Sequence, residues 1–274
     1  MNLVTPAPRA ALQFDDPLYA RIAALIYREA GIVLGPEKVS MMKARLTKRL
    51  SVTGAPDLAD YVVGIDTQRW SGELDHLISA LTTNFTHFFR ESHHFKFLRE
   101  VVFPDAAARA RNLQIWSAGC SSGQEPYSIA ITGRQSDIRM SITATDIDRS
   151  ILERARRGVF TETEIANMAP DVLKAGFQTC AEGYEIRRQV RDMVVFDQLN
   201  LHGAWKFDQP FDVIFCRNVI IYFDLESQMR LWQKFRQQLR PGGWLLIGHS
   251  ERIPDHLRDQ LRPVAHTIYQ HVPN

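Results

Sequence analysis

The chain has 274 residues, of which 45% are hydrophobic and 23% charged, and its formal net charge is +2. This composition is that of an ordinary soluble globular protein, and the length allows two domains. So small a net charge argues against a nucleic-acid-binding protein. No apolar run approaches the ~18 residues that a membrane-spanning helix needs, and the N-terminal segment lacks the apolar core of a signal peptide.

The cysteines and the first residues bear on where the protein works. Cys120, Cys180 and Cys216 are far apart and form no Cys-x-x-Cys pattern. Such spacing predicts neither a zinc site nor a disulfide framework, and it fits a reducing cytoplasm. The Ala- and Pro-rich segment 1–14 is expected to be a disordered tail. We therefore expect a cytoplasmic protein without membrane insertion.

Residues 15–82 predict an all-helical domain. Leu18, Ile22 and Ile26 recur at helical spacing, and Gly31 follows them as a stop signal. Further helices are predicted over 36–50, 57–63 and 73–81.

The second of these predicted helices is strongly basic. Against one acid, Glu37, it carries Lys38, Lys43, Arg45, Lys48 and Arg49. A charged helix is usually only a solvated surface. The alternative is a docking surface for an acidic partner, because clustered charge attracts its opposite over a distance.

From residue 113 onward, predicted strands alternate with predicted helices. Such alternation predicts an α/β domain over 83–274 with a doubly wound, mostly parallel sheet. The expected strands are 113–117, 141–146, 193–196, 211–216, 243–248 and 266–271. The Arg-Pro-Gly-Gly turn at 240–243 is expected to end a helix and start a strand. The segment 184–190 alternates like an exposed strand, which predicts a small β subdomain inserted at about 158–192.

The segment Trp116–Tyr127 joins the first expected strand to a helix. It contains Gly119 and Gly123, so its spacing is Gly-x-x-x-Gly rather than the Gly-x-Gly-x-x-Gly that cradles a pyrophosphate. Glycines in such a turn let the backbone pass close to a ligand. The turn suits S-adenosylmethionine, which carries no phosphate. The alternative is a simple tight turn.

The next expected strand ends in an acid. Asp146 lies 27 positions after Gly119, and an acid about 20 residues beyond the first glycine usually accepts the ribose hydroxyls. Asp148 is expected to cap the following helix. A capping role is also the alternative for Asp146.

Two arginines indicate how ligands could be held. The strand 211–216 opens into Arg217 and Asn218 at its carboxyl end, where ligands of such sheets bind. Many methyltransferases acting on nitrogen carry Asn/Asp-Pro-Pro-aromatic there, so the Cys-Arg-Asn-Val of this chain weakens the case for an amine or nucleobase acceptor. Arg90 follows an aromatic stretch, and its planar fork suits a carboxylate of the cofactor or of the substrate. For each arginine the alternative is a surface side chain.

His93 and His94 are assigned to packing and capping, and the aromatic residues mostly to packing. His87, His93, His94 and His249 have no carboxylate or cysteine at ligand spacing, so we predict no metal site. The aromatic residues expected to form mostly interdomain core, one of them covering the adenine, are Phe85, Phe88, Phe89, Phe95 and Phe97.

Taken together, these features resemble the CheR-type chemotaxis receptor methyltransferases. The resemblance extends from about 18 to 269. It rests on segments in a fixed order: 81–91, the glycine turn with Glu125-Pro126-Tyr127, Asp146, 215–224 and 248–251. It implies a class I, Rossmann-like methyltransferase domain beside the N-terminal helical domain. The implied reaction moves a methyl group from S-adenosylmethionine to glutamate side chains of chemoreceptors, giving γ-glutamyl methyl esters and S-adenosylhomocysteine for sensory adaptation.

The resemblance also assigns site residues. The family's cofactor contacts fall on Asn84, Thr86, Arg90, Glu125, Asp146, Asn200, Leu201, Arg217 and Asn218. The glycine turn adds Gly119. Tyr222 falls on the tyrosine thought to face the substrate glutamate, and with Arg90 it forms the expected catalytic pair. A glutamate with a pKa of ~4.3 is already ionised near neutral pH, so no catalytic base is expected.

The implied partner is the cytoplasmic helical bundle of chemoreceptors, which is rich in glutamate in its methylated region. The basic helix would steer such a surface toward the enzyme. Some family members bind a receptor pentapeptide through the inserted β subdomain and have a longer, glycine-rich loop before its edge strand. The equivalent stretch here, 177–184, is shorter and has one glycine, so we predict independence of the pentapeptide. We expect a monomer.

Two other functions fit parts of the pattern. A methyltransferase acting on a small molecule or a nucleic acid would share the fold, and a non-catalytic cofactor-binding module would only dock to receptors. The Cys-Arg-Asn segment argues against the first alternative. The presence of Asp146 and Tyr222 argues against the second.

Overall fold

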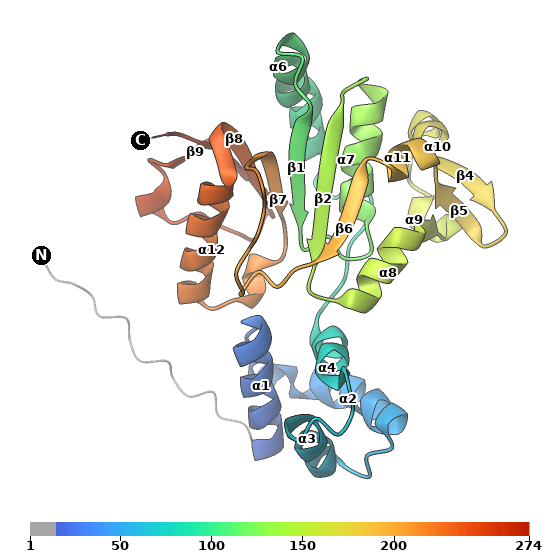
Figure 1. Ribbon diagram of the computed structural model, residues 1–274, viewed down its shortest axis with the longest axis vertical. Helices are drawn as coiled ribbons and strands as arrows, with labels where there is room; N and C mark the ends of the chain where they lie inside the picture. Colours follow the sequence, from blue (N-terminus) through green and yellow to red (C-terminus); the bar gives the residue numbers. More distant parts are fainter. Residues whose placement is uncertain (1–14, 274) are drawn as a thin grey trace, which may run out of the picture. The chain divides into compact units, whose positions relative to one another are not determined.

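The computed structural model describes residues 15–273 and divides the chain into two compact units, Met1–Leu81 and Thr82–Asn274 (Figure 1). The tail expected at 1–14 lies outside the described residues. Among the helices within 15–273, none combines the length and the apolarity needed to cross a membrane.

The first unit is helical, as expected. Its elements are α1 (Pro17–Ala30), the 3-10 turn η1 (Pro36–Lys38), α2 (Val39–Thr53), α3 (Leu58–Asp66) and α4 (Glu73–Leu81). The Asp16 side chain accepts a hydrogen bond from the Leu18 amide at the start of α1 (2.8 Å). Gly31 ends that helix with a φ of 72°, which confirms the predicted stop signal, because glycine enters the left-handed region at little cost.

The second unit is built on a mostly parallel sheet, which confirms the predicted fold class. Within residues 15–273 its seven strands lie in the order β6-β2-β1-β7-β8-β10-β9. Their bounds are β1 (Leu113–Ala118), β2 (Met140–Asp146), β6 (Val194–Gln198), β7 (Phe211–Cys216), β8 (Leu239–Ile247), β9 (Leu261–Ala265) and β10 (Ile268–His271). The pairs β6–β2, β2–β1, β1–β7 and β7–β8 are parallel, whereas β10 is antiparallel to β8 and β9.

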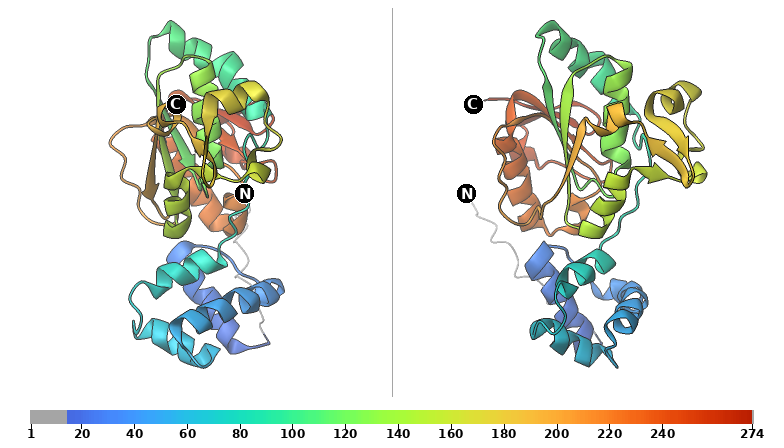
Figure 2. Two further views of the ribbon diagram at one scale, coloured as in Figure 1. Left: turned by 90° about the vertical axis from the view of Figure 1, so that its right-hand side faces the viewer. Right: turned by 45° about the vertical axis from the view of Figure 1, so that its right-hand side comes forward.

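Helices cover both faces of this sheet (Figures 1 and 2). Side chains of a strand alternate between faces, and here alternate residues enter two separate cores. On one face Ile115 and Phe215 pack with Ile129 of α7 (Gln124–Gln135). On the other face Trp116 and Ile214 pack with Phe235, and α12 (Leu225–Gln238) supplies that residue. The sheet is therefore the middle of three layers, as a doubly wound fold requires.

The remaining helices connect or flank these strands. They are α5 (His93–Phe97), the π-helical turn η2 (Leu98–Val102), α6 (Phe103–Ala108), α8 (Arg149–Arg157), the 3-10 turn η3 (Ile220–Tyr222) and the 3-10 turn η4 (Asp255–Leu257).

Two strand predictions were wrong in detail. The expected turn at 240–243 lies inside β8, which begins at Leu239. Leu239 pairs with Phe211 and Trp244 pairs with Val213, so the four residues between Leu239 and Trp244 bulge opposite the single Asp212. The helix α12 does end just before this turn, at Gln238, but the turn residues themselves form an irregular stretch inside the strand. Strand β9 was missed, because Leu-Arg-Pro-Val-Ala shows no clear alternation.

An inserted subdomain follows β2 and α8, as predicted (Figure 2). Within the described chain its sheet has the order β3-β5-β4, with β3 (Val159–Phe160), β4 (Phe177–Cys180) and β5 (Gly183–Ile186). Its short helices are α9 (Glu162–Ile165), α10 (Pro170–Gly176) and α11 (Arg188–Arg191). The last helix corrects the prediction of one strand over 184–190. Ile186 and Val190 are both buried, and a spacing of four residues fits either element.

Candidate active site

The predicted cofactor residues gather at one edge of the main sheet. β1 lies between β2 and β7. The chain passes from β1 to β2 and then β6 on one side, and afterwards crosses from β6 to β7 on the other side of β1. In open α/β sheets such a reversal opens a crevice outside the carboxyl ends of the strands. Gly119 follows β1, Asp146 ends β2 and Arg217 follows β7.

The glycine turn after β1 is tightly packed. The amides of Gly119 and Cys120 both donate to the Thr145 carbonyl of β2 (2.8 and 2.9 Å). Gly119 has a φ of 77°, and a Cβ on it would lie 2.3 Å from a methyl of Val219. Glycine is therefore required at this position both by its backbone angle and by the loop after β7 that packs against it.

Asp146 is 8% exposed and is held by backbone amides. Its Oδ2 accepts from the Ser121 amide (2.8 Å) and its Oδ1 from the Asp148 amide (3.0 Å). A carboxylate offers about four acceptor positions, so Asp146 can accept from at least one further donor. Burial raises the pKa of Asp146 to about 6. Asp148 is the residue that caps α8, through the Ser150 and Ile151 amides (2.9 and 3.2 Å), which confirms its predicted role and leaves Asp146 free of a capping role.

Asn84 ties the segment before Arg90 to this corner. Its Nδ2 donates to Asp148 Oδ2 (2.8 Å), and its carbonyl accepts from Ser121 Oγ (3.1 Å). Thr86, two residues on, is half-buried. The segment is thus fixed against both the glycine turn and the end of β2.

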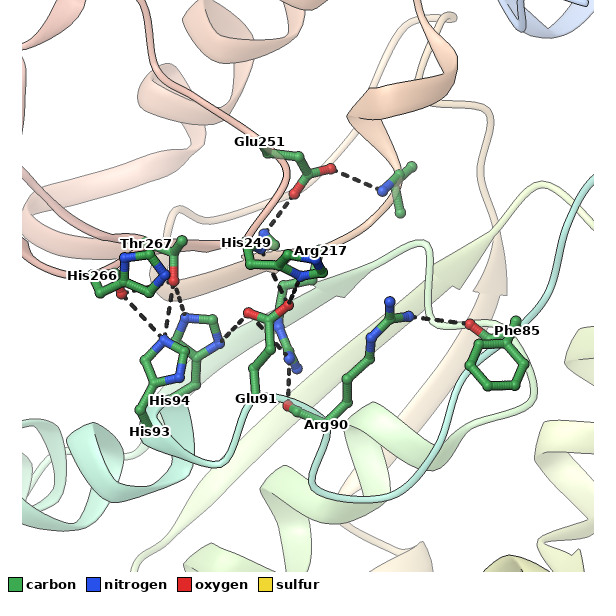
Figure 3. A network of polar contacts seen from close by, with 12 residues as sticks. Phe85, Arg90, Glu91, His93, His94, Arg217, His249, Glu251, His266 and Thr267 are labelled. Atoms are coloured by element: carbon green, nitrogen blue, oxygen red, sulfur yellow. Dashed lines mark hydrogen bonds and ion pairs between the residues drawn. The ribbon is translucent and has the colours of Figure 1, made fainter.

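Arg217 forms the centre of a buried charge network (Figure 3). Its Nη1 lies 3.2 Å from Glu125 Oε2 and its Nη2 lies 3.5 Å from Glu91 Oε2. The same Nη2 also donates to the Arg90 carbonyl. Burial raises the pKa of Glu125, against the opposing effect of Arg217. Burial also acts to raise the pKa of Glu91. The charge of Arg217 and the contacts with His249 outweigh burial, so the pKa of Glu91 is lowered.

Glu91 and Glu251 are the residues that we missed as site residues. Glu91 accepts from the amide of His249 (3.2 Å) as well as pairing with Arg217. Glu251 is 3% exposed and accepts from the amides of Val219, Ile220 and Gly248. Both lie in segments that carry the family resemblance. Both acids stand among polar and charged neighbours, so the family resemblance of these segments was the available signal, and the sequence did not show their partners.

The proposed catalytic pair differs from this network in being accessible. Arg90 is half-buried, and its Nη1 donates to the Phe85 carbonyl (3.2 Å). Within residues 15–273 its guanidinium pairs with no carboxylate, so most of its donors are available. Tyr222 ends η3 and is half-buried. Its hydroxyl makes no hydrogen bond within the described part of the chain.

The loops after β7 and β6 carry the other predicted cofactor residues. Asn218 adopts a left-handed backbone (φ 59°), and its buried Oδ1 has no hydrogen-bond partner among residues 15–273. Asn200 Oδ1 accepts from the His202 amide (2.9 Å). Leu201 is buried, and its carbonyl accepts from Lys234 Nζ (3.1 Å). Burial lowers the pKa of that lysine to about 8.

The expectation that no carboxylate lies within ligand distance of the histidines was wrong. A carboxylate, Glu91, does lie within 4.8 Å of ring nitrogens of His93 and His94. His94 is fully buried, its Nε2 lies 2.9 Å from Thr267 Oγ1, and burial lowers its pKa to about 2. The guanidinium of Arg217 already supplies the positive charge beside Glu91. The prediction that the protein binds no metal stays a prediction.

The aromatic prediction was partly wrong. Phe88 and Phe95 lie in the core of the α/β unit itself, with Phe89 and Phe97 packed against it, rather than forming interdomain core. Phe85 is the exception, with 76% of its surface exposed.

The five cations of the basic helix fall into two groups. Lys38, Lys43 and Lys48 are exposed. Arg45 donates to the Ala80 carbonyl (3.1 Å), and Arg49 pairs with Glu73 (2.5 Å). The two arginines are therefore engaged inside the helical unit.

A cavity of about 260 Å³ lies at the opposite edge of the sheet, where β1 and β7 begin. Its arginines are already paired with acids: Arg111 and Arg240 with Asp212 (both 3.2 Å), and Arg109 with Asp105 (3.0 Å). We therefore interpret it as a gap within a structural ion-pair network.

Comparison with known proteins identifies the family. Residues 17–82 match the CheR methyltransferase all-alpha domain, and residues 84–270 match the CheR methyltransferase SAM-binding domain. A probable chemotaxis protein methyltransferase of Rhizobium etli is 39% identical over 259 residues, which cover 90% of this chain and 97% of the relative. The chemotaxis protein methyltransferase of Escherichia coli K12 is 38% identical over 267 residues, covering 94% and 92%.

The solved structure of the glycopeptide N-methyltransferase MtfA with S-adenosyl-L-methionine is 18% identical. It covers 53% of this chain and 52% of its own, with a TM-score of 0.33, which is too low to support an argument. The two family domains and the two relatives identify the family without this structure. The chain belongs to the CheR methyltransferase family and is an S-adenosylmethionine-dependent methyltransferase of chemotaxis.

Proposed function

We propose that this protein methylates glutamate side chains of chemoreceptors, giving γ-glutamyl methyl esters and S-adenosylhomocysteine. The observation that carries the proposal is the similarity to chemotaxis protein methyltransferases, 38–39% identical over 90% or more of the chain and therefore including the helical domain. S-adenosylmethionine supplies a methyl group on a sulfonium centre. The protein binds and orients the reactants.

The residues at the strand ends fit such a cationic, ribose-bearing cofactor. The Asp146 carboxylate has acceptor capacity beyond its backbone donors, which suits the ribose hydroxyls. Asn218 Oδ1 is a buried acceptor that lacks a donor within residues 15–273, and such groups rarely stay unsatisfied. Glu125 adds negative charge, which attracts a positively charged ligand. We assign Asn84, Thr86, Gly119, Asn200, Leu201 and Arg217 to the same site.

Tyr222 and Arg90 are the residues we assign to the acceptor carboxylate. A glutamate is ionised near neutral pH, so it needs orientation and partial desolvation rather than a base. The Tyr222 hydroxyl can donate one hydrogen bond without neutralising the charge. The planar guanidinium group of Arg90 can attract the same carboxylate electrostatically. Arg217 is unsuited to this task, because Glu125 and Glu91 already balance its charge.

Docking of the receptor is assigned to the exposed lysines of α2. Lys38, Lys43 and Lys48 offer three exposed positive charges to a glutamate-rich helical bundle. Such charges mainly raise the rate of encounter. We exclude Arg45 and Arg49 from this docking surface, because their guanidinium groups already bind groups within the helical unit.

The inserted subdomain supports independence of a receptor pentapeptide. The stretch 177–184 is a hairpin rather than a loop, with Cys180 paired to Gly183 across the two-residue turn Ala181–Glu182. The hairpin turn has only two residues, so it provides no longer loop that could shape a groove beside the edge strand β4. Titration of the protein with the receptor's C-terminal pentapeptide tests this, and micromolar binding would refute it.

Transfer of tritium from labelled cofactor to receptor cytoplasmic fragments tests the main proposal. Base-labile recovery of methanol identifies a carboxyl methyl ester. Base-stable label would instead indicate an amine acceptor, and cofactor binding without transfer would indicate a docking module. In the same assay Tyr222→Phe should lower kcat by about 10- to 100-fold, because a hydrogen bond to a charged group contributes about 1.5–3 kcal/mol. Tyr184→Phe, the same change on the inserted sheet, is the matched control and should retain activity.

A further inference from the structure

Glu251 is a buried carboxylate that joins two loops of the site (Figure 3). It is 3% exposed and follows β8 by four residues. Its Oε2 accepts from the Gly248 amide (2.6 Å), and its Oε1 accepts from the amides of Val219 and Ile220 (both 2.9 Å). One side chain therefore satisfies three backbone donors from two different segments.

These donors belong to the segments that shape the acceptor side. Val219 precedes η3 and Ile220 begins it, so their amides are free of partners within that turn. The same turn ends at Tyr222. Gly248 is the first residue after β8. Glu251 thus holds the start of the turn that presents Tyr222 and ties it to the end of the neighbouring strand.

The loop has little room to adopt another shape. On one side the missing Cβ of Gly119 would lie 2.3 Å from Val219. On the other side a Cβ on Gly248 would lie 2.7 Å from Asn218 Nδ2. Neither glycine leaves space for a side chain, so the loop is closely packed on both sides.

The chemistry of the three donors calls for an ionised carboxylate. An ionised carboxylate only accepts hydrogen bonds, whereas an amide or a protonated acid also donates. Glutamine has nearly the shape of glutamate, but its NH2 would face at least one backbone N–H and would leave that donor unsatisfied. Burial raises the pKa of Glu251, and the backbone donors act in the opposite direction.

We propose that Glu251 is a positioning residue for methyl transfer, which sets the place of the Tyr222 hydroxyl without touching either substrate. This inference rests on the role proposed above for Tyr222. It predicts that loss of the Glu251 charge affects the acceptor step much more than cofactor affinity. Asp146, Asn84 and Glu125 have partners outside the loop that Glu251 holds, and Asn218, which adjoins Val219, is the exception among the residues assigned to the cofactor.

A double-mutant cycle tests the inference. Turnover of receptor fragments is measured for Glu251→Gln, Tyr222→Phe and the double variant, each normalised to the number of S-adenosylhomocysteine sites found by calorimetry, so that unfolded protein is not counted. Glu251→Gln should lower kcat by about 10-fold or more and change the Kd for S-adenosylhomocysteine by less than about threefold. In the Tyr222→Phe background it should lower kcat by less than about threefold, because residues that act as a unit are non-additive.

Two controls complete the cycle. Glu153→Gln makes the same change at an exposed position of α8 and should have no effect. Glu251→Asp keeps the charge on a shorter side chain and should give an intermediate kcat. If Glu251→Gln lowers kcat equally in both backgrounds, or not at all, Glu251 does not act through Tyr222 and the inference is overturned. If Tyr222→Phe alone keeps full turnover, the role proposed for Tyr222 is itself refuted.

Discussion

Two arginines, one in each unit, pair with buried carboxylates and yet have different tasks. Arg49 of the helical unit pairs with Glu73, which also accepts from the Tyr61 hydroxyl (2.5 Å). Arg217 of the α/β unit pairs with Glu125 and Glu91. In both cases the carboxylates are shielded from water and depend on the arginine for their counter-charge.

The two arginines differ in which parts of the fold carry the residues that pair with them. Arg49, Tyr61 and Glu73 lie on α2, α3 and α4, so their contacts hold three helices together. The partners of Arg217 lie at the start of α7 and in the segment before α5, close to the strand ends where the cofactor residues gather. We therefore expect the same chemical pair to stabilise the fold in one unit and to shape the proposed cofactor site in the other. Four changes test this distinction.

The largest effect is expected for Arg217→Met. The change leaves Glu125 and Glu91 without their cation, and breaking a buried pair from one side costs about 3–5 kcal/mol. Affinity for S-adenosylhomocysteine, measured by calorimetry, should fall by at least about 100-fold. Arg188→Met, which alters a side chain that is 92% exposed, is the control. Affinity within twofold of the unchanged protein would show that Arg217 is not part of the cofactor site.

Arg49→Met should act on stability instead. It leaves Glu73 unpaired, and because the arginine side chain is 15% exposed we expect a loss near the low end of that range, about 3 kcal/mol in the free energy of unfolding of the helical unit. The affinity for S-adenosylhomocysteine should not change. Denaturant unfolding and calorimetry measure the two quantities, with Lys48→Met as the exposed control. Unchanged stability together with weaker receptor methylation would instead make Arg49 a docking residue.

Asp146 should make cofactor binding depend on pH. Its pKa of about 6 means that the acceptor form is lost as the pH falls through 6, so affinity should fall by up to about tenfold per pH unit below that value. Between pH 6 and its ordinary value of 3.8 the folded state binds a proton that the unfolded state does not, so the contribution of Asp146 to stability rises as the affinity falls. Asp146→Asn should remove this pH dependence and weaken binding at pH 8. An unchanged pH profile in the variant would mean that another group titrates.

The smallest effect is expected for Lys43→Glu combined with Lys48→Glu. Receptor methylation should weaken at low salt, and the difference should shrink as salt rises, because exposed charges are screened over ~8 Å at physiological ionic strength. Cofactor affinity and stability should stay the same, since both lysines are exposed. The dependence of kcat/KM on salt is the measurement. Normal methylation by the double variant at low salt would show that α2 is only a solvated surface.

Much of the fold followed from the sequence, because its signals are local. Gly31 ends α1 through its own backbone freedom, and Asp148 caps α8 through amides two and three residues away. The spacing of Gly119 and Asp146 likewise predicted a cofactor corner, since a turn and a strand end need only neighbouring residues. In the inserted subdomain local signals were less decisive, because the spacing of Ile186 and Val190 fits a strand as well as a helix.

Only the tertiary structure decided the partners of charged residues. Arg45 and Arg49 have the same sequence signature as Lys43 and Lys48, but contacts with α4 turned the arginines inward. Glu251 reaches amides about 30 positions earlier in the chain, and Glu91 meets Arg217 across 126 positions. A charged residue in a sequence can be solvated at the surface, can interact with a helix end or can pair with a residue far away in the chain. The choice depends on burial, and burial exists only once the sheet has brought its strand ends together.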